Sequence, residues 1–280
     1  MTEVRRLLAV ASARLRAAGV GSPEHDAAEL LAHVLGTMRA GLVVAGEPSA
    51  EQERDYDALV ARRAAREPLQ HLTGVVGFRH VELAVGPGVF VPRPETELLA
   101  GWAIERARDL AAPVVVDLGT GSGAIARAVL DEVPHARVHA TELDEDALAW
   151  ARRNLEGTGA DVRHGDLAHA FPDLDGSVDV VVSNPPYIPL EAWESVAPEA
   201  RDHDPHLALF SGEDGLDAMR VLERTAARLL RPGGVVGAEH ADVQGASAPA
   251  VFASAGRWRD IADHRDLAGR PRFVTARLAR

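Results

Sequence analysis

Residues 114–124 have the sequence Val-Val-Val-Asp-Leu-Gly-Thr-Gly-Ser-Gly-Ala. The β-branched run at its start is typical of a strand that is buried on both faces of a parallel sheet. Glycines then recur at alternate positions, where they let the backbone bend sharply and approach a ligand closely. A helical pattern begins at Ile125. The stretch therefore predicts a strand, a tight turn, and a helix whose first N–H groups are free.

The alternation of strand and helix continues towards the end of the chain. Further strands are predicted over residues 137–142, 161–164, 179–182 and 235–239, and a helix over residues 216–230. This alternation predicts an α/β fold with a doubly wound, mostly parallel sheet. Residues 259–263 and 273–278 are predicted to form an antiparallel pair of strands at the edge of that sheet.

The N-terminal part of the chain has a different pattern. Residues 1–70 carry only helical signals, including a capping box from Ser49 to Gln52, and predict a small helical bundle. Short strands with glycine-rich punctuation, the first predicted over residues 72–78, indicate a β-hairpin linker over 71–92. The α/β domain then spans 93–280. The bundle is either a partner-binding domain or a stabilising extension, because fold does not determine function.

Composition narrows the class of protein. The net charge is −12, which argues against a broad basic face for nucleic acid. Cysteine is absent, which excludes disulfides and thiolate metal sites, and the histidines lack metal-ligand spacing, so no metal is expected. No apolar run approaches the roughly 20 residues of a membrane span. We therefore expect a soluble, cytoplasmic protein that needs neither a membrane nor direct contact with nucleic acid.

Two ligands fit the glycine turn. Gly119, Gly121 and Ala124 match the dinucleotide pattern, and a purely structural turn is a third interpretation. Asp117 favours S-adenosylmethionine, because a carboxylate there can reach the amino group of the methionine moiety but would repel a pyrophosphate. The predicted contacts of this cofactor in and before the turn are Asp117, Gly119, Thr120, Gly121, Ser122 and Gly123.

Acidic residues follow the next two predicted strands. Glu142 ends the first, 23 residues after Gly119, where a carboxylate can accept hydrogen bonds from both ribose hydroxyls. Asp166 follows the second and is predicted to accept a hydrogen bond from the adenine amino group, with Leu167 beside the ring. A plain surface turn explains Asp166 and Leu167 equally well.

Residues 180–188 have the sequence Val-Val-Val-Ser-Asn-Pro-Pro-Tyr-Ile. Pro185 and Pro186 have no N–H, so the sheet ladder ends there in a stiff loop. The loop lies where open α/β sheets bind ligands. Asn184 and the Pro185 carbonyl offer acceptors for a planar NH₂ group, and Tyr187 offers a flat face. A simple proline-rich turn is the alternative.

Within these two stretches, Asp117–Gly123 and Asn184–Tyr187 together resemble the class I S-adenosylmethionine-dependent amino-methyltransferases. Four further stretches narrow the resemblance to the HemK/PrmC family: Glu67–Gly74, Pro92–Glu97, Asp214–Asp217, and Glu239-His240 followed by Gln244. The resemblance implies the class I methyltransferase fold and methylation of N5 of the glutamine in the Gly-Gly-Gln motif of class 1 peptide-chain release factors. It implies S-adenosylhomocysteine as product, a substrate-recognising bundle and a monomer.

The resemblance also implies roles for the loop after the fourth strand. Asn184, Pro185 and Tyr187 would be catalytic. These three residues and Pro186 would bind the substrate, and Asn184 would also contact the cofactor. Departures are small: Glu142 replaces the Asp of many relatives, Leu167 an aromatic residue of some, and Ala241 a Gly.

Other functions are considered beside this one. A sister enzyme that methylates glutamine in a ribosomal protein is the nearest alternative, followed by amino-methylation of a nucleic-acid base, which predicts a basic arm that the sequence lacks. An NAD-binding oxidoreductase and a non-catalytic cofactor-binding module are both disfavoured by Asp117 and Asn184.

Overall fold

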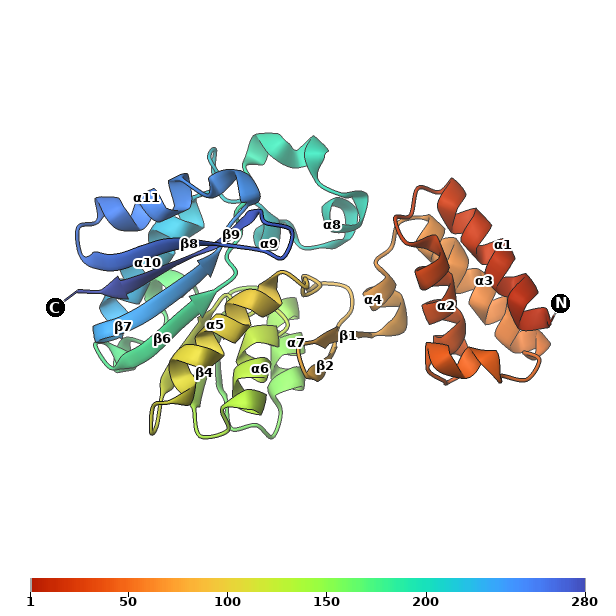
Figure 1. The fold of residues 1–280 in the computed structure, drawn as a ribbon, viewed down its shortest axis with the longest axis horizontal. Helices are drawn as coiled ribbons and strands as arrows, with labels where there is room; N and C mark the ends of the chain where they lie inside the picture. Colours follow the sequence, from red (N-terminus) through yellow and green to blue (C-terminus); the bar gives the residue numbers. More distant parts are fainter. Residues whose placement is uncertain (1, 280) are drawn as a thin grey trace. The chain divides into compact units, whose positions relative to one another are not determined.

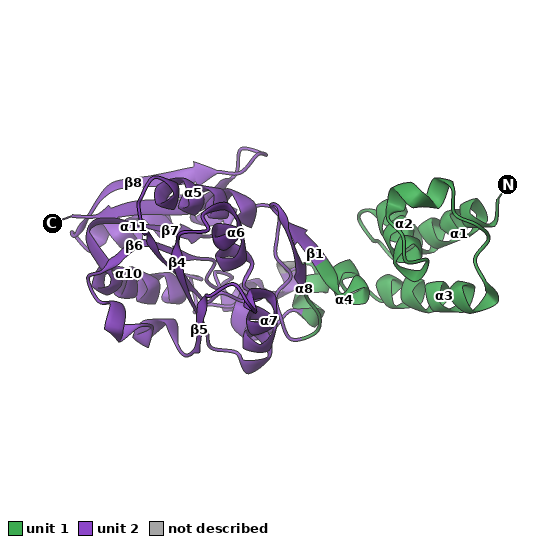
Figure 2. Ribbon diagram, turned by 90° about the horizontal axis from the view of Figure 1, so that it is seen from below, with its two compact units in different colours: residues 1–75, 85–87, 197–203 green, residues 76–84, 88–196, 204–280 purple. Residues whose placement is uncertain are grey.

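The computed structural model describes residues 2–279 of the chain. The chain consists of two compact units, which Figure 2 shows in green and purple. The first contains residues 1–75, 85–87 and 197–203, and the second contains residues 76–84, 88–196 and 204–280. The first unit thus takes in a short segment from late in the chain.

Helices form most of the first unit. They are α1 (Glu3–Ala17), α2 (Pro23–Val34), η1 (Arg39–Val43), α3 (Ala50–Ala64), α4 (Leu69–Thr73) and α8 (Pro198–His203). Their core contains Leu15, Leu30 and Leu31, each without exposed surface. The predicted capping box is confirmed, because the Gln52 N–H donates to Ser49 Oγ and the Ser49 N–H donates to Gln52 Oε1.

An ion-pair cluster attaches α8 to the rest of the first unit. The Glu199 carboxylate accepts from Arg63 at 2.9 Å and from Arg66 at 2.7 Å. Arg63 also donates to Asp26 at 2.7 Å and is 6% exposed. Because a buried charge needs partners, this cluster explains why residues 197–203 belong with the helices.

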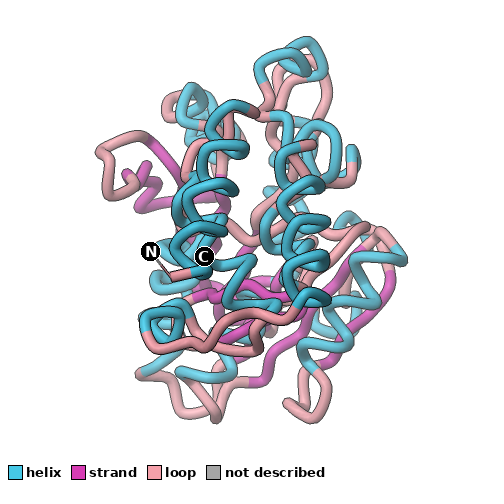
Figure 3. The backbone as a smooth tube through the Cα atoms, turned by 90° about the vertical axis from the view of Figure 1, so that its right-hand side faces the viewer, coloured by secondary structure: helices cyan, strands magenta, loops and turns pink. Residues whose placement is uncertain are grey.

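A seven-stranded sheet organises the second unit, in the order β5-β4-β3-β6-β7-β9-β8. Helices and strands alternate along the chain of this unit. Figure 3 shows the helices of the structure in cyan and the strands in magenta. Its strands are β3 (Val114–Leu118), β4 (Arg137–Glu142), β5 (Asp161–His164), β6 (Val178–Ser183), β7 (Leu230–Glu239), β8 (Trp258–Arg265) and β9 (Pro271–Leu278). The strands β3 to β7 pair in parallel, and β9 pairs antiparallel with both β7 and β8. The predicted doubly wound sheet with an antiparallel edge pair is confirmed.

Helices cover this sheet (Figure 1). They are α5 (Thr96–Arg108), α6 (Ala124–Glu132), α7 (Glu145–Leu155), α10 (Asp217–Leu229) and α11 (Ser247–Ser254). The unit also contains the short helix α9 (His206–Leu209). Short 3₁₀ turns are η2 (Leu167–His169), η3 (Pro172–Leu174), η4 (Leu190–Ser195) and η5 (Asp242–Gln244). The predicted helix over residues 216–230 corresponds to α10.

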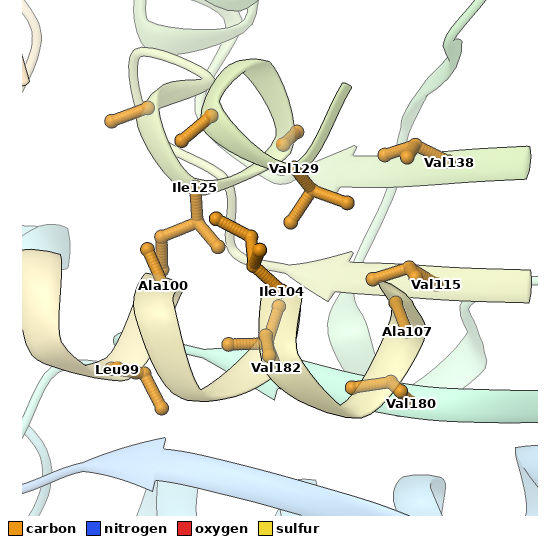
Figure 4. Close-up of a cluster of buried hydrophobic side chains, with 14 of the residues drawn as sticks. Leu99, Ala100, Ile104, Ala107, Val115, Ile125, Val129, Val138, Val180 and Val182 are labelled. Atoms are coloured by element: carbon orange, nitrogen blue, oxygen red, sulfur yellow. The ribbon is translucent and has the colours of Figure 1, made fainter. Parts of the chain in front are cut away.

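Both faces of the sheet are buried. Val115 and Val182 point into a core with Ile104 of α5 and Val129 of α6, as the close-up in Figure 4 shows. The neighbouring Val116 points to the opposite core, which contains residues of α10 and α11. Because side chains alternate along a strand, an unbroken apolar run supplies both cores. Each fully buried valine contributes about 1.5–3 kcal/mol of transfer free energy.

Two predicted element boundaries were wrong. The strand expected from residue 72 begins at Val75 (β1, Val75–Phe78, paired with β2, Val81–Ala84), because α4 extends to Thr73 and ends at Gly74 in the left-handed region. The strand expected from residue 235 begins at Leu230, since Val178 pairs with Leu230 before the register shifts. Among residues 2–279, no helix is long and apolar enough to cross a membrane.

Candidate active site

The carboxyl ends of four adjacent strands in the second unit meet at one edge of the sheet. The aligned pairs there are Leu118 with Thr141, Asp117 with Val182, and Ser183 with Ala238. Parallel strands end on the same side, so the turn after β3, the end of β4, the loop after β6 and the end of β7 are neighbours. This edge gathers Asp117, Glu142, Asn184 and Glu239.

The glycines of the turn after β3 serve two purposes. Gly119 and Gly121 have φ of 69° and 57°, and a Cβ on either would meet no atom within 4 Å. Glycine adopts this left-handed conformation without strain and leaves open space beside the backbone, as a ligand-binding turn requires. Gly123 instead faces α7, where a Cβ would lie 3.2 Å from Leu155 Cδ1. Ser122 is 2% exposed.

Asp117 has one engaged and one unengaged carboxylate oxygen. Its Oδ2 accepts from the Thr120 hydroxyl at 2.6 Å and from the Ala126 N–H at 3.2 Å. Its Oδ1 is buried and has no hydrogen-bond partner in the described part of the chain. Burial raises the pKa of this carboxyl to about 7. An ammonium group at Oδ1 would supply the missing partner and favour the ionised form, so the site fits the amino group of S-adenosylmethionine.

Glu142 is fixed by three backbone donors. Its Oε2 accepts from the Gly121 N–H at 2.8 Å, and its Oε1 accepts from the Leu143 and Asp144 N–H groups at 2.8 and 2.9 Å. The carboxylate is thereby tied to the glycine turn. Its Oε2 accepts only one of these bonds and keeps a lone pair for a hydroxyl donor, which fits the predicted contact with a ribose.

Asp166 and Leu167 have local structural roles. Asp166 is exposed and caps η2, because its Oδ1 accepts from the Ala168 N–H at 2.8 Å. Leu167 is partly buried and packs against the core beside α10 and α11. Their predicted contact with adenine remains a prediction.

The loop after β6 presents two acceptors. Asn184 is half-buried, and its Nδ2 donates to the Thr96 hydroxyl at 3.3 Å. Within residues 2–279, neither Asn184 Oδ1 nor the Pro185 carbonyl accepts a hydrogen bond. Pro186 has no N–H that could compete with a ligand for the Pro185 carbonyl. The loop therefore keeps two neighbouring acceptors available for donors from a ligand.

Tyr187 is fixed at both its ring and its backbone. Its hydroxyl donates to Glu239 Oε1 at 3.2 Å, and burial raises the pKa of the phenol. Its carbonyl accepts from Gln244 Nε2 at 3.1 Å. The chain at Gly215 lies so close that a Cβ there would be 2.2 Å from the Tyr187 carbonyl oxygen. Only glycine fits this contact without a shift of the loop.

Sequence reasoning assigned no role to several residues that build this loop. They are Thr96, Gly215, Glu239, Gln244 and Ser183, whose hydroxyl donates to the Leu118 carbonyl at 2.6 Å. Four of them lie in stretches that carry the family resemblance, which was the one signal available, and Ser183 directly precedes such a stretch. His240, by contrast, is buried between the Ala241 carbonyl and Asp263. The described residues contain no group of three or more side chains that could hold a metal ion.

Comparison with known proteins agrees with this architecture. A family described as "PrmC N-terminal domain" matches residues 6–74, and one described as "Methyltransferase small domain" matches residues 95–197. The structure of the hMettl16 catalytic domain with a MAT2A 3′UTR hairpin has a TM-score of 0.55 and covers 70% of this chain and 75% of its own. At 15% identity, that likeness shows the fold alone.

Two curated relatives are much closer in sequence. The "4-amino-L-phenylalanine/4-methylamino-L-phenylalanine methyltransferase" of Streptomyces pristinaespiralis is 50% identical over 204 residues, which cover 71% of this chain and 70% of the relative. The "Release factor glutamine methyltransferase" of Streptomyces coelicolor is 63% identical over 274 residues, which cover 97% of both chains. With this identity over nearly its whole length, the chain belongs to the release factor glutamine methyltransferase family.

Proposed function

We propose that this chain transfers a methyl group from S-adenosylmethionine to N5 of the glutamine in the Gly-Gly-Gln motif of a class 1 peptide-chain release factor. The observation that carries the proposal is the pair of unengaged acceptors, Asn184 Oδ1 and the Pro185 carbonyl, beside a glycine turn that fits the methyl donor. A primary amide has two N–H donors on one nitrogen, which match two acceptors. The 63% identity with a relative of that name supports the substrate.

The chemistry requires an amide nitrogen to act as a nucleophile. Its lone pair is delocalised into the carbonyl, so it reacts only when it is well aimed and when positive charge on it is stabilised. Asn184 Oδ1 and the Pro185 carbonyl accept hydrogen bonds from its two N–H groups. These hydrogen bonds orient the nitrogen and stabilise the positive charge on it. Tyr187 packs against the amide plane. The proton leaves the nitrogen after the methyl transfer, and no residue is assigned as a strong base.

S-adenosylmethionine, the methyl donor of this family, supplies an electrophilic methyl group when bound. Asp117 Oδ1 holds the amino group, and Glu142 accepts hydrogen bonds from the ribose hydroxyls. Gly119 and Gly121 let the backbone approach the ligand, and the neighbouring Thr120, Ser122 and Gly123 complete the turn. Asp166 and Leu167 would contact the adenine, and Asn184 would contact both the methyl donor and the acceptor.

The helical unit recognises the release factor in this proposal. A match to an N-terminal domain named for the same family over residues 6–74 supports that role. Acting on a translation factor implies a cytoplasmic protein, and we expect a monomer.

Radiolabel transfer from the cofactor to a purified release factor tests the substrate. Labelling is expected with the wild-type factor and is expected to be absent when the glutamine of its Gly-Gly-Gln motif is replaced by alanine. Undiminished labelling of that alanine variant would overturn the proposal.

A second candidate acceptor is an aromatic amine, favoured by the 50% identity with the amino-phenylalanine methyltransferase. The 97% coverage by the release factor enzyme and the match over residues 6–74 favour the protein substrate instead. Assays with 4-amino-L-phenylalanine and with a glutamine-bearing ribosomal protein separate these acceptors, because the proposed function predicts that the release factor is methylated with by far the highest kcat/KM.

A further inference from the structure

The loop of residues 184–187 after β6 is the acceptor loop, and Glu239 contacts two residues that shape it. This carboxylate, at the end of β7, is 1% exposed. Its Oε2 accepts from the Thr96 hydroxyl at 2.7 Å, and its Oε1 accepts from the Tyr187 hydroxyl at 3.2 Å. Both oxygens are therefore satisfied inside the protein, so the group is not arranged to bind a ligand.

Thr96 connects this carboxylate to Asn184. Thr96 begins α5 and is 4% exposed. A hydroxyl has one proton and two lone pairs. An ionised carboxylate can only accept, so the Thr96 proton points to Glu239. Towards Asn184, Thr96 can then act only as an acceptor.

The direction of that bond determines how the Asn184 amide is turned. Because Thr96 Oγ1 accepts, the NH₂ end of the amide faces Thr96, at 3.3 Å. The Oδ1 end must face the other way, where it accepts no hydrogen bond from the described residues. An amide turned by 180° would present donors to the NH₂ group of the substrate, and donors repel donors.

We propose that Thr96 and Glu239 are positioning residues for methyl transfer, which fix the amide orientation of Asn184 and the ring of Tyr187. The inference rests on the proposed function, since it gives Asn184 Oδ1 the role of accepting from the substrate amide. Neither residue touches the substrate. They act by excluding the flipped amide and by anchoring the aromatic face.

Thr96→Val is the sharpest test, because valine has the shape of threonine without a hydroxyl. With a release factor as substrate and at saturating cofactor, kcat is expected to fall on the order of 10- to 100-fold, as for a misaligned reacting group. The dissociation constant for S-adenosylhomocysteine is expected to stay unchanged. Thr96→Ser restores the hydroxyl, so its kcat is expected to stay within a few-fold of wild type.

A matched control comes from α10. Thr225 is also buried, at 3% exposed, and lies outside the acceptor loop, so Thr225→Val makes the same chemical change without touching Asn184. Its kcat is expected to match wild type. Wild-type kcat in Thr96→Val would overturn the inference, as would a kcat for Thr96→Ser as low as that for Thr96→Val.

Glu239→Gln distinguishes positioning from proton transfer. The glutamine oxygen can accept from Thr96 and its NH₂ can donate to the Tyr187 oxygen, so orientation is largely kept and kcat is expected to fall only a few-fold. Loss as severe as that of Asn184→Ala would mean that Glu239 takes part in proton transfer, which overturns the inference. The proposed function fails separately: it fails if Asn184→Ala keeps wild-type turnover, whereas the inference alone fails if Asn184→Ala is inactive and Thr96→Val is not impaired.

Discussion

Asp117 and Glu239 are both buried at the carboxyl ends of parallel strands, but they differ in the hydrogen bonds that their carboxylate oxygens accept. Burial raises the pKa of Asp117 and of Glu239 to about 7 in each case. Among residues 2–279, Asp117 Oδ1 has no hydrogen-bond partner, whereas both oxygens of Glu239 accept from hydroxyl groups of the protein. A buried charge with a missing partner fits ligand binding, and one with its partners inside the fold fits positioning. The comparison therefore separates a donor side, after β3 and β4, from an acceptor side, after β6 and β7.

The largest expected effect is on the acceptor side. Asn184→Ala removes one of the two acceptors for the substrate amide, so kcat is expected to fall by at least about 100-fold. The donor side should not respond, and the dissociation constant for S-adenosylhomocysteine, measured by calorimetry, should stay within about threefold of wild type. Equal loss of turnover and of cofactor affinity would mean that Asn184 is mainly structural and that the two sides are not separate.

The next effect belongs to the donor side. The amino group of the cofactor binds the ionised form of Asp117, and this form is lost as pH falls through about 7. The dissociation constant for S-adenosylhomocysteine is therefore expected to rise by about tenfold per pH unit below that value. Asp117→Asn removes the charge and should both weaken binding at pH 8 and abolish the dependence below pH 7.

Asp204 provides a matched control for that substitution. It is also a buried aspartate whose Oδ1 has no hydrogen-bond partner in the part of the chain that the structure describes, but its Oδ2 pairs with Arg93. Burial raises its pKa to about 6. Asp204→Asn should leave the pH dependence of cofactor binding as in wild type. A pH dependence that survives in Asp117→Asn would assign it to another group and contradict the ammonium contact.

A smaller effect is expected from Glu239. Below about pH 7 this carboxyl becomes protonated, and when its proton lies on Oε2 it donates to Thr96, whose own proton can then point elsewhere. Among its charged neighbours, Arg272 favours the ionised form and Glu95 opposes it. At saturating cofactor, kcat is expected to fall a few-fold as pH drops through about 7.

Glu239→Gln cannot titrate, so the acidic limb of its kcat profile should be absent. Saturating cofactor keeps Asp117 ionised and moves its titration out of this measurement. An unchanged acidic limb in Glu239→Gln would mean that a group other than Glu239 causes it. The contrast between Asp117 and Glu239 would then hold for the donor side alone.

The donor side was readable from sequence, and the acceptor side only in part. The apolar run before Asp117 and the glycines after it predict a strand and a turn by local rules, and Glu142 follows from its place after the next strand. Glu239 and Thr96 are 143 residues apart, and no periodicity relates them. Their contact exists because α5, which begins at Thr96, packs against β6 and β7, and these two strands pair so that Ala238 lies beside Ser183. Only a known strand order reveals such a relation.

The late segment of the first unit was unpredictable for a similar reason. Residues 197–203 belong with the helices because Glu199 pairs with Arg63 and Arg66. Charged residues on a helical pattern usually indicate a solvated face, and nothing in the sequence distinguishes these two arginines from their neighbours on α3. Hydrophobic periodicity thus predicts a core, whereas specific polar pairs require the fold.

The smallest expected effect concerns a buried side-chain hydrogen bond that joins the two sides near the carboxyl ends of β3 and β6. The Ser183 hydroxyl, from β6, donates to the Leu118 carbonyl of β3 at 2.6 Å and is buried. Ser183→Ala is expected to lower the free energy of unfolding by about 0.5–1.5 kcal/mol, measured by urea denaturation. Ser254→Ala removes an exposed hydroxyl bond within α11 and should cost less. Asp117 acts on cofactor binding and Glu239 on the acceptor loop. If the two sides work independently, kcat and the cofactor affinity of Ser183→Ala should both stay near wild type. A drop in both together would show that this bond couples them.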